Sequence, residues 1–139
     1  MASIIYNSML NDLSKGSIDF DTDTFKCMLV TSSYTPSKSH SKRSDITNEV
    51  TGTGYTTGGN TATAAVALIN NTSNLQDIGW SITSWTSSTI TARGAVVYKA
   101  RGGASSADEL VGYLDFVTDQ SSSGGTFTVT VGTPLRLQN

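Results

Sequence analysis

The sequence predicts a mainly β fold, namely an antiparallel β-sandwich or jelly-roll-like barrel with one short N-terminal helix. The first observation behind this prediction is the apolar spacing, which changes from about 3.6 residues before Gly16 to about 2 after it. The second is that clusters of Gly, Ser, Thr and Asn interrupt the alternating runs. The third is that strands do not alternate with helices along the chain, as they would in a parallel sheet.

The helix is predicted at residues 4–15. Apolar residues recur there at helical spacing, while Asn and Asp fill the other side. Gly16 follows Lys15, in the position where a helix C-terminus favours glycine. The apolar positions are Ile5, Met9, Leu10 and Leu13.

The rest of the chain is predicted to form strands. On the run that contains Ile78, Trp80 and Ile82, these three side chains share one face of the strand. Threonines suit the opposite face, because a β-branched residue packs on the pleat while its hydroxyl contacts water. Each strand is therefore expected to have one buried and one polar face. The predicted strands are 24–31, 61–69, 78–85, 89–99, 110–117 and 126–131, with short pieces at 49–51 and 135–137.

Size and charge limit the classes of protein to consider. The chain has 139 residues, which fits one domain over 1–139, and a domain of that size buries about two thirds of its unfolded surface. Only 14% of the residues are charged and the net charge is −2, which argues against nucleic acid as a partner. No apolar stretch approaches the roughly 18 residues of a membrane span, so no membrane partner is expected.

The N-terminal residues predict folding in a cytoplasm, and the lone cysteine bears on stability. Residues 1–6 lack the basic and apolar regions of a secretory signal. Cys27 is the only cysteine, so the chain has no internal disulfide, and stability must come from packing or from association with other copies. Its apolar neighbours predict a buried, inert thiol.

Two segments are predicted to be loops. Residues 32–47 form the longest irregular segment, which is expected to be a mobile stretch or an arm that reaches a partner. Residues 52–59 contain four glycines and should turn the chain sharply. This glycine-rich loop lacks the spacing of a dinucleotide or phosphate-binding loop, so no cofactor is expected there.

Enzyme and metal signatures are sparse. One histidine, His40, and one cysteine are too few for the usual zinc ligand sets within a single chain. A Ser-His-Asp triad would need His40, which lies in the loosest loop and is better explained as a surface histidine. We therefore expect a protein without catalytic residues, and a small hydrolase built on His40 is the least favoured alternative.

The one acidic cluster allows two interpretations. Asp19, Asp21 and Asp23 alternate, so their carboxylates could lie on one side and bind calcium. Thr24 and Val30, however, stand where an EF-hand needs glycine and a bidentate glutamate. The favoured interpretation is a helix-to-strand turn in which aspartates cap backbone amides, so no metal is expected.

A basic cluster and two tryptophans complete the candidate residues. The cluster contains no interleaved aromatic residues, so a solvated loop or a contact with an acidic protein surface is expected rather than nucleic-acid binding. Trp80 lies on the apolar side of its strand and should pack in the core, whereas Trp85, at a strand end, is predicted to be an exposed contact. The basic cluster is Lys38, His40, Lys42 and Arg43.

Several turn-and-strand segments follow one another along nearly the whole chain. They are residues 16–19 and 23–26, 29–36, 48–59, 85–98, 114–116 and 123–129. In these segments the chain resembles a family of small virion structural proteins of tailed bacteriophages, and the resemblance covers residues 4–131. None of the segments is a catalytic motif, so the resemblance carries over no active-site residue.

The resemblance implies a capsid cement or decoration protein that binds the outer surface of the head. Its partners would be the major capsid protein of a tailed phage and other copies of this chain, as a dimer or trimer. Such a protein would bridge neighbouring capsid subunits and make or break no covalent bond. Its location would be the capsid surface of the virion.

The elements expected to bind this partner are the arm, residues 32–43, and the loop at 52–59. The alternative is a structural or glycan-binding module of a tail or fibre, which would use exposed aromatics such as Tyr55 or Trp85. The candidate contact residues are Tyr34, Pro36, Lys38, His40, Lys42, Arg43, Tyr55 and Trp85.

Overall fold

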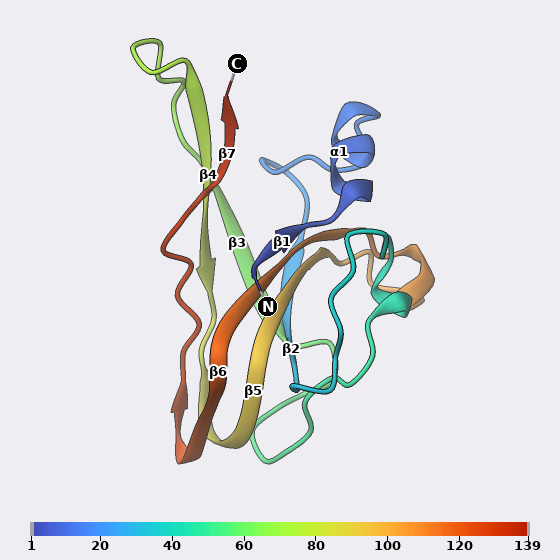
Figure 1. The fold of residues 1–139 in the computed structure, drawn as a ribbon, viewed down its shortest axis with the longest axis vertical. Helices are drawn as coiled ribbons and strands as arrows, with labels where there is room; N and C mark the ends of the chain where they lie inside the picture. The colour runs from blue at the N-terminus through green and yellow to red at the C-terminus, as the bar shows by residue number, and fades with distance from the viewer. Residues whose placement is uncertain (1, 139) are drawn as a thin grey trace.

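The predicted fold class is confirmed: a computed structural model describes residues 2–138 as a mainly β, sandwich-like fold with a single short α-helix (Figure 1). Met1 and Asn139, the ends of the predicted domain, lie outside the described residues. The strands form one antiparallel sheet in the order β1-β6-β5-β2-β3-β4-β7. They are β1 (Ile4–Ile5), β2 (Phe25–Val30), β3 (Asn60–Val66), β4 (Leu75–Ile82), β5 (Trp85–Lys99), β6 (Leu110–Phe127) and β7 (Leu135–Gln138).

The main core lies on one face of this sheet. Phe20 and Phe25 pack their rings on Trp80 at centroid distances of 5.9 and 5.2 Å, both edge to face, which is a favourable geometry for aromatic pairs. This confirms that Trp80 packs in the core. Cys27 is fully buried in the same cluster, as expected, and burial raises the pKa of its thiol to about 12.

A second core lies on the opposite face, so the expectation of one polar face per strand is wrong for the central strands. In β2, Phe25 and Leu29 belong to the main core, while Met28 and Val30 belong to the second one. The chain from residue 31 to residue 48 crosses this second face and covers it, with Tyr34 packed into the cluster. A segment that reads as a polar loop therefore serves as a layer of the fold.

The helix is shorter than predicted. α1 spans Asn7–Ser14, and its Met9 is fully buried in the main core, with Leu13 packed beside it. Ile4 and Ile5, predicted as the first helical residues, instead pair with Tyr113 and Gly112 at the edge of β6. The predicted stop is confirmed: Gly16 adopts φ 72°, and its amide donates to the carbonyl of Leu13.

The largest difference between prediction and structure concerns β6. The strands predicted at 110–117 and 126–131 are joined in one strand, Leu110–Phe127, and residues 128–131 lie outside it. Its pairing with β5 is interrupted near Arg93, where residues 116–119 form a wide bulge containing Val117 at φ 70°. The polar residues 120–125 look like a turn in the sequence, yet they continue the strand and pair with β5 at residues 120–122 and 125.

The other strands are shifted at their ends. β3 stops at Val66, three residues before the predicted end, and β4 begins at Leu75, three residues before the predicted start. β5 begins at Trp85, four residues earlier than predicted. The piece at 49–51 is only an isolated bridge between Glu49 and Val30, whereas the short C-terminal strand is confirmed as β7.

Candidate functional site

The arm is packed against the body along its length, contrary to the expectation of a reaching or mobile segment. Tyr34 is only 5% exposed, and its hydroxyl lies 3.0 Å from the hydroxyl of Tyr6 and 2.9 Å from Nδ1 of His40. The backbone amide of Asn7 donates to the carbonyl of Lys38. Tyr34 is therefore an interior anchor and not a contact residue, and His40 is half-buried beside it.

Arg43 closes the arm onto the start of β6. Its Nε donates to Oδ2 of Asp108 at 2.7 Å, and its guanidinium lies 5.2 Å from the centre of the Tyr98 ring. The Asp108 side chain is only 3% exposed, so this is a largely desolvated ion pair. The backbone follows the same course, since the amide of Arg43 donates to the carbonyl of Asp108.

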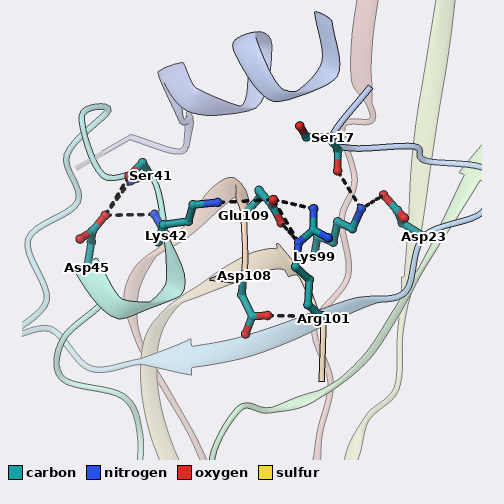
Figure 2. A network of polar contacts seen from close by, with 9 residues as sticks. All are labelled: Ser17, Asp23, Ser41, Lys42, Asp45, Lys99, Arg101, Asp108 and Glu109. Carbon is teal, nitrogen blue, oxygen red and sulfur yellow. Dashed lines mark hydrogen bonds and ion pairs between the residues drawn. The ribbon is translucent and has the colours of Figure 1, made fainter. Parts of the chain in front are cut away.

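Lys42 belongs to the same group of contacts. Its Nζ lies 3.4 Å from Oε1 of Glu109, whose other partner is Arg101, bound through two nitrogens at 2.7 and 2.9 Å (Figure 2). Burial raises the pKa of Glu109, but the hydrogen bonds from Arg101 and the charge of Lys42 outweigh burial and lower that pKa to about 2. We call Lys42, Arg43, Arg101, Asp108 and Glu109 the clasp.

The acidic cluster near β2 makes turn contacts, as the favoured interpretation expects. Oδ2 of Asp23 accepts from the amide of Asp19, and Oδ1 of Asp19 accepts from the amide of Asp21. Lys99 donates to Asp23 at 2.8 Å and to the carbonyl of Ser17 at 2.7 Å (Figure 2). These carboxylates therefore hold the turn between α1 and β2.

Tyr55 and Trp85 lie together, but neither is displayed at the surface. Trp85 is 1% exposed, so its prediction as an exposed contact is wrong: the Tyr55 ring stacks on it at 6.0 Å and Phe127 packs edge to face at 6.2 Å. Tyr55 donates its hydroxyl proton to Glu49 at 2.7 Å and accepts from the amide of Leu29. A glycan could not stack on Trp85 without opening the core.

Of the predicted contact residues, Lys38 is the one that is exposed, and five others are half-buried: Pro36, His40, Lys42, Arg43 and Tyr55. Lys42 and Arg43 are engaged in the clasp, and His40 contacts Tyr34, so Lys38 and Pro36 are the arm residues considered below as contacts. Residues 52–57 are exposed except for the half-buried Tyr55, while Gly58 and Gly59 are buried and hold φ values of 93° and 75°. The sharp turn expected of this loop is confirmed, and both the arm and the loop contain exposed residues.

The connection of β3 and β4 carries an apolar surface that the sequence did not predict. Leu68 is 95% exposed and Ile69 is 68% exposed, and they lie on the projecting end of that hairpin (Figure 1). Both fall within the strand predicted at 61–69, whereas β3 ends at Val66. No residue from Val66 to Asn74 is charged, and this feature of the sequence could have indicated an exposed apolar site that contacts another protein.

An apolar groove lies on the same molecule, between the two edges of the sheet. Its volume is about 620 Å³, and its walls come from β1 and β6 on one side and from residues 131–136 on the other. Side chains of the main core form part of its lining, among them Trp80 and Val97. The groove therefore lies between β1 and β7, the two edge strands of the sheet.

No group of three or more His, Cys, Asp or Glu side chains between residues 2 and 138 is placed to hold a metal ion. In the same part of the chain, no helix has the length and apolar character needed to cross a bilayer.

Comparisons with protein-family models, with curated proteins and with solved structures found no match to this chain.

Proposed function

We propose that this protein is a non-enzymatic structural component of a tailed-bacteriophage virion, a cement protein that binds the outer face of the head. The resemblance of residues 4–131 to that class of proteins supports the virion assignment. The clasp supports a structural role. Its buried carboxylates form ion pairs that hold the arm against the body, and they do not activate a nucleophile or a proton donor.

The observation that carries the proposal is the exposed apolar end of the β3–β4 hairpin. A leucine that is 95% exposed beside an isoleucine that is 68% exposed marks a surface built to be covered by another protein. The sheet has a buried cluster on each of its two faces, so the body of the protein should lose little conformational entropy on binding. A part with these properties acts by association.

The arm and the loop at 52–59 supply the contacts to the major capsid protein. Lys38 presents a positive charge on an arm whose conformation is already fixed by Tyr34 and Arg43. It therefore suits an acidic patch on the capsid subunit, with Pro36 beside it as an apolar contact. Repeated over many copies, a modest contact of this kind becomes a firmly attached layer.

The test is binding to heads that lack the protein. Lys38→Glu should reduce occupancy on such heads, while Lys15→Glu, which reverses an exposed charge next to α1, should bind as the unaltered chain does. Deleting residues 37–43 is a poor test, because it removes Lys42 and Arg43 of the clasp. Undecorated heads that bind none of these proteins would refute the cement role.

A tail or fibre location is the alternative for the same structural role. Adsorption of the protein to purified tails instead of heads would favour it. Its glycan-binding form loses its main support, because Trp85 is buried and Tyr55 is engaged with Glu49 and Leu29.

A further inference from the structure

The hairpin end, residues 67–74 between β3 and β4, and the groove between β1 and β7 are both apolar, and one projects where the other is concave. The end is a narrow projection that carries two branched aliphatic side chains and no charge. The groove is a concave apolar surface of about 620 Å³, which is within the size range of sites that enclose a ligand. The charge of Arg136 at the rim is paired with Asp77 through hydrogen bonds of 2.7 and 2.8 Å, so the groove presents little net charge.

The hairpin end is held in shape before any partner binds. The amides of Thr72 and Ser73 both donate to Oδ1 of Asn70 at 3.0 Å, and Asn70 exchanges backbone hydrogen bonds with Leu75. Leu68 and Ile69 are therefore displayed by a closed turn. Display by a preformed turn lowers the entropy cost of inserting them into a partner.

The hairpin end cannot fill the groove of its own chain. The groove is lined by residues of β1, β4, β5 and β6 and by residues 131–136, and no residue of the hairpin end is among them. Leu135 of the groove wall pairs with Ile78 of β4, and Ile78 pairs in turn with Val66 of β3. Leu68, two residues beyond Val66, therefore lies two strands away from Leu135 on the groove wall and outside the lining, which leaves the groove open to a second molecule.

We propose that the hairpin end of one copy inserts Leu68 and Ile69 into the β1–β7 groove of a second copy. This inference rests on the association role proposed above and names its partner as the chain itself. The neutral character of both surfaces favours their mutual burial, since neither one leaves an unpaired charge when water is removed. In a reciprocal dimer or a small ring, every hairpin end is inserted into a groove and every groove is occupied, so the assembly is closed.

The test uses two variants that each lose one half of the contact. Leu68→Asp places a charge on the hairpin end and leaves the groove intact. Ile5→Arg places a bulky charge at the β1 wall, where Ile5 is 37% exposed, and leaves the hairpin end intact. Leu10→Asp, at a 56% exposed position on α1 outside both surfaces, is the matched control. Far-ultraviolet circular dichroism and thermal unfolding check that each variant folds.

Sedimentation velocity and native mass spectrometry at micromolar concentration give the readout. The unaltered chain and Leu10→Asp should associate, and each of the two variants alone should associate at least about tenfold more weakly. An equimolar mixture should associate more strongly than either variant alone, because one intact end then meets one intact groove.

Three results would overturn the inference: a monomeric unaltered chain, a folded variant that associates as tightly as the unaltered chain, or a mixture no stronger than its components. For example, if two hairpin ends bound each other directly, the Ile5→Arg variant would associate as tightly as the unaltered chain, which is the second of these results. The experiment contains no capsid, so its failure is distinct from a failure to bind heads. A chain that associates but ignores undecorated heads would refute the cement role alone.

Discussion

Nε of Arg43 lies 2.7 Å from Oδ2 of Asp108, and this pair joins the end of the arm to the two residues that precede β6. The two residues are 65 positions apart in the chain. Because Asp108 is almost fully buried, the pair fixes which way the arm crosses the second face of the sheet. The arm is therefore a structural layer over the second face of the sheet, and some of its residues, such as Lys38, are exposed to solvent.

Asp108→Asn should destabilise the fold. The amide keeps the shape of the carboxylate but leaves the Arg43 guanidinium without its counter-charge in a desolvated position, and we expect a loss of about 1–3 kcal/mol in the free energy of unfolding. Urea denaturation followed by tryptophan fluorescence measures the loss. Asp119→Asn, which removes an ion pair of Arg93 at a 49% exposed side chain, should change stability by less than about 1 kcal/mol. Equal effects of the two substitutions would contradict this assignment.

Stability should fall in acid, and Glu109 should account for part of the fall. Its folded-state pKa of about 2 lies below its ordinary value of 4.5. A carboxylate with a lowered pKa contributes stability above its unfolded-state pKa, and this contribution is lost as pH falls from about 4.5 toward 2. Thermal unfolding across this range should show a flatter pH dependence for Glu109→Gln than for the unaltered chain. Parallel curves would argue against the role of the clasp.

Gly59→Ala should prevent normal folding. Gly59 has φ 75°, and a Cβ there would collide with the carbonyl of Cys27 in the neighbouring strand. Gly102 has a similar φ of 79° with open space around it, so Gly102→Ala should cost only the conformational strain of about 1–2 kcal/mol. Soluble yield and thermal unfolding of the two variants compare these costs. A stable Gly59→Ala variant would show that β3 does not approach β2 as described.

Trp85→Ala should act on stability and not on recognition. Removing a side chain that is 1% exposed and stacked on Tyr55 should cost about 3–5 kcal/mol. Chemical denaturation measures that cost. If the variant kept full stability and instead lost adsorption to a glycan, Trp85 would have to be a surface contact after all.

The sequence predicted the fold class and most strand positions because alternation and turn residues report on local geometry. It missed the burial of Tyr34 and Trp85, since a tyrosine in a polar loop and a tryptophan at a strand end look the same whether or not another segment covers them. The partners of Arg43 and Lys42 lie in residues 108–109, and nothing in local spacing pairs segments so far apart.

The exposed end of the hairpin was missed for a different reason. Leu68 and Ile69 continue the apolar run of β3, and periodicity cannot tell a buried continuation from a displayed one. The long β6 was divided in two because its Ser- and Gly-rich middle has the composition of a turn, although pairing with β5 holds it extended.

Quantitative mass spectrometry of purified virus particles from the infected host tests the central claim most directly, because it asks whether this chain belongs to the finished particle. The account predicts that the chain is present in many copies per particle, in a fixed ratio to the major capsid protein. Particles of full infectivity and normal composition in which this chain is absent would contradict it.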